Sequence, residues 1–505
     1  MKRRILAMFL LLSVLLAGCT PAVDGNEDQG CDIHSDANND GMCDQCSQSV
    51  ITTFDFYTIN DLHGKLDDGE NHPGVDELTT FFKNARAMDD NVVILSAGDM
   101  WQGSSESNLT YGAIMTDWMN EVGFTAMALG NHEFDWGEAY IERNSEAAEF
   151  PFLAINIYDR KTDAQVDYCQ SSVVIDADGI QIGIIGAIGD CYSSIASDKV
   201  KDVYFKTGAE LTTLVKAESE KLRNEGVDFV VYVLHDGSSH NSGTSATVIA
   251  PNKMKSYYDA ALSDGYVDLV FEGHTHQQYL AMDSYGVYHL QNRGDNKGGI
   301  SHVEVQFNTV TGNRHITVKE LVVTDKYDDL ADDPLVDELL DKYEEQISPA
   351  NRIVGKNAAK RSSDTLRRIV AQLYYEAGLE KWGQAYEITL GGGYLSVRSP
   401  YSLESGEVKY SQLQALFPFD NDLVLCSVKG RDLLDKFINT GNENYFISGN
   451  PALMNSVDPN GTYYIVVDTY TSSYAPNRLT VVEEYGNGIY ARDLLAEYIG
   501  QGGMA

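Results

Sequence analysis

Apolar residues recur along the chain in short runs that alternate with stretches of helical periodicity. From residue 51 onward, solid or alternating apolar runs typical of strands occur at 53–59, 92–95, 126–129, 152–155, 180–188, 229–234 and 269–271. Segments with helical spacing, such as 112–121 and 207–224, lie between several of them. Two more strands are expected at 303–307 and 315–323. This alternation predicts a layered α/β fold.

A charged stretch separates this region from the rest of the chain. Asp332, Asp333 and Pro334 resemble a helix start, and residues 326–350 are interpreted as a helical linker. Residues 351–505 mix helical and strand patterns. A chain of 505 residues is too long for one ordinary core. We therefore expect a larger α/β domain over 51–325 and a smaller α+β domain over 351–505.

The first residues have the pattern of an export signal. Lys2, Arg3 and Arg4 precede an apolar run over 5–16, which is too short for a membrane-spanning helix. The run ends in "LAGC", which resembles the lipobox of bacterial lipoproteins and implies removal of residues 1–18 and a lipid on Cys19. We expect attachment to the extracytoplasmic face of a bacterial cell membrane through this lipid only. An ordinary secretory signal is the alternative.

The polar leader over 19–50 gathers potential metal ligands. Cys31 and His34, followed by Cys43 and Cys46, form two pairs at a spacing that zinc sites use, because a short loop lets each pair chelate one ion. This module precedes the first strand, so we do not expect it to catalyse a reaction.

The same leader also resembles the start of a calcium loop. Asp36, Asn38 and Asp40 present oxygen atoms at alternate positions, but Ser47 stands where the twelfth position of an EF-hand needs Glu. Zinc, calcium, and a plain stalk or disulfide without metal all stay open as interpretations.

Composition narrows the class of partner. The apolar fraction of 43% indicates a globular protein, and the formal net charge of -38 is strongly acidic. Such a surface repels polyphosphate, which argues against a nucleic-acid polymer as partner. A small anionic substrate would need metal ions in its site to overcome the negative electrostatic field of the protein.

Five of the expected strands end in side chains that bind metals. At these ends stand Asp61, His63, Asp99, Asn131, His235, His274 and His276. Loops at strand ends build the sites of α/β folds, so we expect these side chains to hold two divalent ions. In this prediction Asp61, His63 and His276 hold one ion, Asn131, His235 and His274 hold the other, and Asp99 bridges them. The donor types accept Mn, Zn, Fe or Co alike.

The segments "DLHG", "GDMWQGSSESNLTYG", "GNHEFDWG", "LHDG" and "GHTH" resemble the signature blocks of calcineurin-like metallophosphoesterases. The resemblance is to the secreted 5'-nucleotidase and 2',3'-cyclic-nucleotide phosphodiesterase family, and it runs over roughly residues 53–310. It implies a four-layer α/β/β/α sandwich followed by the smaller C-terminal domain. It also implies that His132 acts on the leaving oxygen while Asp135 orients the imidazole. For Glu133 we expect a structural role.

The resemblance extends to a C-terminal substrate-recognition domain. It implies that Arg398 and Arg361 meet a phosphate, that Phe419 stacks on a base and that Asn421 lies nearby. Tyr470 or Tyr474 would supply a second aromatic wall.

This domain also departs from the family pattern. "RSSDTLRRIVAQL" stands where a Glu-x-x-Leu-Gly-Asn-Leu block is usual, and "DTYTSSYAPNRL" replaces a Gly-Gly-Asp-Gly-Tyr block. In "GGGYLSVR" the Arg lies three places later than in the family. The alternative for this region is that 391–393 form a turn and that Phe417 and Phe419 only fill a core.

These observations predict a hydrolase in which two metal ions activate water against a phosphate ester of a small nucleotide, a 5'-monophosphate or a 2',3'-cyclic nucleotide. One alternative keeps the chemistry but acts on nucleotide sugars, other diphosphate esters or sulfur oxyanion esters. Another is a lipid-anchored nucleoside-binding protein that has lost catalysis. The sequence leaves the oligomeric state open.

Overall fold

The computed structural model describes residues 33–66, 74–237, 247–248, 265–283, 285–294, 299–322, 330–398, 400–474, 477–486 and 488–504. The signal segment, Cys19 and Cys31 lie outside the described residues. No helix within the described ranges has both the length and the apolar character that crossing a bilayer requires.

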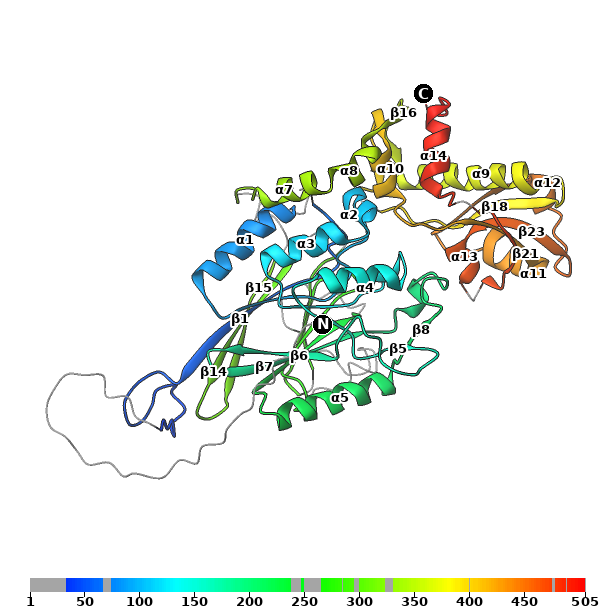
Figure 1. Ribbon diagram of the computed structural model, residues 1–505. Helices are drawn as coiled ribbons and strands as arrows, with labels where there is room; N and C mark the ends of the chain where they lie inside the picture. The colour runs from blue at the N-terminus through cyan, green and yellow to red at the C-terminus, as the bar shows by residue number, and fades with distance from the viewer. Residues whose placement is uncertain are drawn as a thin grey trace, which may run out of the picture.

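Two β-sheets form the centre of the first half of the chain (Figure 1). The first sheet has the order β15-β14-β1-β2-β3-β4 and the second β10-β12-β13-β11-β9-β7-β6. The strands of the first sheet are β1 (Ile51–Ile59), β2 (Val92–Ser96), β3 (Ala126–Ala128), β4 (Phe152–Leu153), β14 (Ile300–Asn308) and β15 (Arg314–Val322). Those of the second are β6 (Ser172–Ala177), β7 (Ile180–Ile188), β9 (Phe229–His235), β10 (Thr247–Val248), β11 (Leu269–Glu272), β12 (Tyr279–Met282) and β13 (Tyr288–Gln291). A small pair, β5 (Ile157–Asp159) and β8 (Val203–Phe205), lies beside them.

Successive side chains of a strand point to opposite faces of its sheet, and this alternation produces the layers. Phe54 and Phe56 of β1 face the second sheet, where both rings contact Phe229, while Tyr57 and Ile59 face the helices. The helices on that side are α1 (Val75–Met88), α2 (Ser105–Thr110), α3 (Ala113–Val122) and α4 (Glu138–Ala147). Helix α5 (Ala209–Asn224) covers the far face of the second sheet (Figure 1). The four-layer α/β/β/α prediction is confirmed.

Most predicted strands coincide with observed ones, but their pairing is not sequential. The strands expected at 303–307 and 315–323 are β14 and β15, which return to the first sheet, and β14 runs antiparallel to β1 with Phe56 opposite Val303. Strands β6, β12 and β13 were not among those predicted from the sequence.

The described part of the predicted linker, residues 330–350, contains two short α-helices. Helix α7 (Leu335–Lys342) begins directly after Pro334, and the Asp333 carboxylate accepts a hydrogen bond from the Leu335 N–H at 3.0 Å. Helix α8 (Glu344–Ile347) follows. Asp333 pairs with Lys83 of α1, and Asp117 of α3 pairs with Lys342. These contacts fasten the linker to the helical face of the first half.

The C-terminal half has its own sheet and core. Its five strands follow the order β22-β18-β23-β21-β24, and the long helix α9 (Ser363–Trp382) packs against them. The sheet strands are β18 (Ile388–Tyr394), β21 (Leu423–Lys429), β22 (Tyr445–Gly449), β23 (Thr462–Asp468) and β24 (Thr480–Glu484). Two small sheets pair β16 (Ile353–Asn357) with β20 (Gly406–Lys409) and β17 (Arg361–Ser362) with β19 (Ser402–Leu403). The other helices are α10 (Tyr410–Leu416), α11 (Gly430–Leu433), α12 (Pro451–Met454), α13 (Thr469–Ser473) and α14 (Ala491–Gly500).

The interpretation of 391–393 as a turn is wrong, because these residues lie within β18. Gly391 is required there for packing. A Cβ at this position would collide with the backbone N of Tyr375 in α9.

Candidate active site

The candidate ligands converge at one edge of the two sheets. Asp61, Asp99 and Asn131 follow β1, β2 and β3, which run parallel to one another. His235 ends β9, and His274 and His276 follow β11, which is parallel to β9. Since the carboxyl ends of parallel strands meet at one edge, residues up to 215 positions apart become neighbours.

Asp61, His63 and His276 form one group, and their ligand atoms all lie within 4.8 Å of one another. The Nε2 atoms of His63 and His276 are 3.3 Å apart, and His276 Nε2 is 3.3 Å from Asp61 Oδ1. The structure therefore brings together the three side chains predicted to hold the first ion.

The remaining candidates gather around His235. Its Nε2 atom lies 3.2 Å from Asp99 Oδ2 and 3.2 Å from Asn131 Oδ1. The ring of His274 stands 5.3 Å from that of His235. Asp61, Asp99 and His235 also form a converging group, which makes the two clusters continuous.

The imidazoles are oriented by hydrogen bonds on their other nitrogen. With the proton assigned to Nδ1, His235 donates to the Ala97 carbonyl at 2.6 Å and His63 donates to the Gln102 carbonyl at 2.8 Å. Each Nε2 lone pair then points into the cluster, toward carboxylate and amide oxygens. Such inward-facing N and O atoms fit divalent cations.

The local backbone is strained where the ligands stand. Asp61, His63, Asp99, His274 and His276 all have positive φ, between 51° and 74°. Left-handed backbone costs a non-glycine residue roughly 1 kcal/mol or more, and it persists only where the surroundings impose it. Close approach adds a second constraint, because a Cβ on Gly130 would collide with Asp99 Oδ1.

Glu133 supports these turns and does not face the cluster. Its carboxylate accepts hydrogen bonds from the N–H groups of Asp99, Met100 and Gly130 at 2.7–2.9 Å. Burial, with the Asp99 charge second, raises the pKa of Glu133 to about 7. Burial also opposes ionisation of Asp99, but when the surrounding imidazoles are protonated their positive charges, first of all that of His235, hold the pKa of Asp99 well below its usual value.

His132 and Asp135 form the expected pair. His132 Nδ1 donates to Asp135 Oδ2 at 2.8 Å, and the backbone N–H of His132 donates to Asp99 Oδ1 at 2.8 Å. On its other side, His132 Nε2 accepts a hydrogen bond from Arg398 Nη2 at 2.8 Å. This contact joins the two halves of the chain.

A cavity of about 240 Å³ lies between the halves. Asp99, Asn131, His132, Asp135, His274 and His276 line one wall, and Arg398, Phe419, Asn421 and Tyr470 line the other. The cavity thus joins the predicted metal cluster to four of the five predicted substrate residues.

Arg361 does not line the cavity, and the prediction that it meets the phosphate there is not supported. It lies in β17, which pairs with β19, and its Nε donates to Asn357 Oδ1 at 3.2 Å. Tyr474 is likewise absent from the described lining and is exposed, so Tyr470 is the residue that can supply the aromatic wall.

The two phenylalanines of "FPFDN" have different environments. Phe417 is buried and belongs to the C-terminal core, although it also borders the cavity. Phe419 is half-buried, and its ring lies 5.8 Å from the His132 ring and 5.4 Å from the Arg398 guanidinium. The core-filling interpretation therefore holds for Phe417 only.

Several lining residues were not predicted from the sequence. Lys199, Tyr394 and Asp468 border the cavity, and the Tyr394 ring lies 5.7 Å from the Tyr470 ring. Cys191 offers a thiol beside His235 and His274. No motif marks Lys199 or Asp468. Cys191 stands three positions after the end of β7, so the strand-end rule that found the ligands could have found it.

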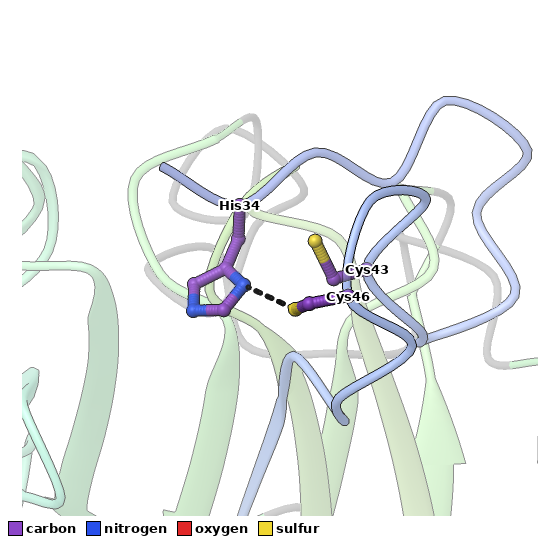
Figure 2. Close-up of side chains that lie close together, drawn as sticks. All are labelled: His34, Cys43 and Cys46. Atoms are coloured by element: carbon purple, nitrogen blue, oxygen red, sulfur yellow. Dashed lines mark hydrogen bonds between the residues drawn. The ribbon is translucent and has the colours of Figure 1, made fainter. Parts of the chain in front are cut away.

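In the leader, His34, Cys43 and Cys46 converge, as Figure 2 shows.

Comparison with known proteins agrees with this geometry. Residues 54–278 match the family model of calcineurin-like phosphoesterases. A protein named UshA from Yersinia enterocolitica is 26% identical over 389 residues, covering 70% of this chain and 68% of its own. A 5'-nucleotidase from Vibrio vulnificus is 25% identical over 403 residues, covering 72% and 69%. The chain contains a calcineurin-like phosphoesterase domain and is a metal-dependent phosphoesterase similar to 5'-nucleotidases.

The fold of this phosphoesterase is also that of solved structures. A 5'-nucleotidase precursor from Thermus thermophilus superimposes with a TM-score of 0.68 at 20% identity, covering 89% of this chain and 96% of the other. The match to the calcineurin-like phosphoesterase family implies a dinuclear metal site. The clusters around His63 and His235 are the candidate places for its two ions.

Proposed function

We propose that this phosphoesterase hydrolyses the phosphate ester of small nucleotides and releases the nucleoside and phosphate, in one hydrolysis from nucleoside 5'-monophosphates or in two successive hydrolyses from 2',3'-cyclic nucleotides. The observation that carries the proposal is the cavity that joins two chemically different walls. One wall has the candidate metal ligands and His132. The other has Arg398, Phe419 and Tyr470, which suit a phosphate and a flat base.

The chain's own residues have distinct tasks in this reaction. Arg398, already in contact with His132, binds the phosphoryl oxygens and orients them. His132 Nε2 faces the leaving oxygen and stabilises or protonates it, while Asp135 fixes the ring through Nδ1. The two divalent ions supply electrophilic stabilisation of the phosphoryl group and a lowered pKa for the attacking water. No covalent nucleophile is needed.

Recognition of the rest of the substrate belongs to the C-terminal wall. Phe419 and Tyr470 present flat apolar rings, and Asn421 offers both a donor and an acceptor for the edge of a base. The two halves correspond to domains over 51–325 and 351–505, joined by a linker over 326–350.

A location outside the cytoplasm is part of the proposal. The signal pattern and "LAGC" support a lipid on Cys19 and attachment to the outer face of the cell membrane. Cys19→Ser should release the protein from the membrane fraction. Continued membrane association of that variant would exclude the lipid anchor.

The function is tested by measuring the products formed from AMP, UMP, a 2',3'-cyclic nucleotide and UDP-glucose, each with Mn²⁺ or Zn²⁺ and each with a chelator. We expect metal-dependent release of phosphate from a monophosphate, or metal-dependent opening of the cyclic nucleotide followed by release of phosphate. Formation of UMP and glucose 1-phosphate from UDP-glucose, without hydrolysis of the other substrates, would move the assignment to nucleotide sugars. Tight nucleoside binding without any release would indicate a binding protein.

A further inference from the structure

The three converging side chains of the leader have the spacing of metal ligands. The ligand atoms of His34, Cys43 and Cys46 lie within 4.8 Å of one another (Figure 2), and His34 Nδ1 is 3.5 Å from Cys46 Sγ. With Zn–N bonds of about 2.0 Å and Zn–S bonds of about 2.3 Å, tetrahedral ligands of these types stand roughly 3.6 Å apart. The observed pair thus has the separation of two ligands of one zinc ion.

Backbone hydrogen bonds hold these side chains in place. The turn between the two cysteines is closed by Ser47 N–H donating to the Cys43 carbonyl at 2.8 Å, and Cys43 N–H donates to the Gln48 carbonyl at 2.7 Å. Asp44 N–H donates to the Ser35 carbonyl at 2.7 Å, which brings the segment with His34 alongside this turn. The arrangement is a chelating turn with a third ligand fixed beside it.

The carboxylates of the leader have a different task. Both Asp36 oxygens accept backbone hydrogen bonds, from Asp40 N and Gly41 N at 3.0 Å, and Asp40 Oδ1 accepts from Met42 N at 2.9 Å. Among the described residues, no converging group of ligands includes Asp36, Asp40 or Asp44. The carboxylates of Asp36 and Asp40 therefore stabilise the turn, whereas the imidazole and the two thiols face a common point.

We propose that His34, Cys43 and Cys46 bind one structural zinc ion, separate from the two ions of the active site. Imidazole and thiolate are the donors of structural zinc sites.

This zinc fixes the leader to the phosphoesterase domain. Asp36 Oδ2 accepts a hydrogen bond from Asn308 Nδ2 at 2.6 Å, and Asn39 Oδ1 accepts one from Asn313 Nδ2 at 2.9 Å. Both asparagines belong to the end of β14 and the turn after it. The leader lies at the start of β1 (Figure 1). Asp61 stands beyond the other end of this strand, which is nine residues or about 30 Å long. The ion would thus stabilise the segment that these hydrogen bonds hold against the domain, far from the substrate.

Metal content of the purified full-length chain tests the proposal. Wild type, Cys43→Ser/Cys46→Ser, His34→Asn and Asp99→Asn are prepared with zinc present, and Zn and Ca are measured per chain. We expect the double variant to lose about one zinc and His34→Asn to bind zinc at least tenfold more weakly. Asp99→Asn should keep the leader zinc. Cys169→Ser is the matched control, because that buried thiol donates to the Ala154 carbonyl and belongs to none of the converging ligand groups among the described residues.

Cobalt substitution and amide hydrogen exchange give independent readouts. The thiolate-to-cobalt absorption should be present in wild type and Asp99→Asn and absent from the double variant. Loss of zinc should increase exchange at least tenfold over 34–50 and leave 92–96 unchanged. Equal zinc in wild type and double variant, loss of calcium in place of zinc, or a Cys43–Cys46 disulfide in the purified wild type would each overturn the proposal.

Discussion

The predicted metal ligands in the N-terminal wall of the cavity stand just after parallel strands, whereas the predicted substrate residues of the C-terminal wall stand in loops and one short helix. Asp99 and Asn131 each follow the end of their strand, β2 and β3, by three positions. Arg398 and Phe419 stand in connecting segments, and Tyr470 lies in α13. Strand ends fix a side chain more rigidly than loops do, so the first wall suits chemistry and the second suits recognition that varies between relatives.

Backbone strain divides the walls in the same way. Asp99, His274 and His276 of the first wall have positive φ, whereas none of the described residues that line the second wall does. Strain at the ligands is tolerated because buried contacts, such as those of Glu133, impose it. The comparison predicts that substitutions in the first wall affect hydrolysis of every nucleotide whatever its base, and that the effects of substituting the aromatic residues in the second depend on whether the substrate carries a base.

The largest loss of activity that tests this difference between the two walls is expected for a substitution of His132. Asn in its place cannot protonate the leaving oxygen, so kcat for AMP should fall about a thousandfold. The fall should be much smaller for p-nitrophenyl phosphate, whose leaving group needs little protonation. Steady-state kinetics with both substrates measures this difference. Equal losses for both would contradict the assigned role.

A matched control for that variant is His302→Asn. His302 is also hydrogen-bonded to a carboxylate, that of Asp55, but its ring stacks on Tyr57 away from the cavity. Activity of this variant should stay within about twofold of wild type, since it removes an imidazole–carboxylate pair without touching the cavity.

Arg398 should have the next largest effect. A charge-assisted hydrogen bond contributes about 1.5–3 kcal/mol, so Arg398→Ala should lower kcat/KM by about 100-fold for every phosphate ester tested. Arg361→Ala is the control and should change kcat/KM by less than about twofold, because Arg361 lies outside the cavity lining. A larger effect at Arg361 than at Arg398 would reverse the placement of the phosphate.

The stability of an Asp468 variant tests how strongly the C-terminal wall is buried. Burial raises the pKa of Asp468 to about 6 from an ordinary value of 3.8. Its neutral form therefore favours folding at low pH, and this contribution is lost as the pH rises through about 6. Asp468→Asn should then be more stable than wild type by about 2 kcal/mol at pH 8, and by much less at pH 4.

Thermal unfolding of wild type and Asp468→Asn at the two pH values measures that difference. Asn can still accept the hydrogen bond from Thr471 N–H that Asp468 accepts at 2.7 Å, so the start of α13 is preserved. A variant that is destabilised equally at both pH values would show that the carboxylate is held charged.

Phe419 should give the smallest effect and the most selective one. Loss of a stacking ring costs about 1–1.5 kcal/mol, so Phe419→Ala should raise KM for AMP about tenfold. KM for glycerol 3-phosphate, which has no base, should change by less than about twofold. Phe417→Ala should instead lower stability by about 3–5 kcal/mol, because Phe417 is buried in the core. An equal change of KM for both substrates would remove base stacking as the role of Phe419.

More residues of the N-terminal wall than of the C-terminal wall could be predicted from the sequence, and the reason is physical. Five strands that end in Asp, Asn or His are readable without a structure, because a strand end fixes where its next residues lie. The three-residue group of Asp61, His63 and His276 follows from that rule. The return of β14 to pair with β1 is a contact between distant segments, and no local pattern encodes it.

The second wall depends on how loops approach a neighbouring half of the chain. Arg361 and Arg398 look equivalent in sequence, yet β17 holds one on a small sheet while the loop after β18 carries the other to His132. Phe417 and Phe419 differ in the same way, although two positions separate them. Lys199 and Asp468 border the cavity only because the halves meet there, so no pattern in either segment identifies them.

The central claim is that side chains from separate strand ends hold two metal ions that this phosphoesterase needs for hydrolysis. The most direct measurement compares wild type with Asp99→Asn, whose side chain has the same size without the charge that joins the clusters. The account predicts that the variant loses at least one of the two active-site ions and that phosphate release from the preferred nucleotide falls about a thousandfold or more. Undiminished release from the variant, or full activity of a wild-type chain stripped of metal, would contradict it.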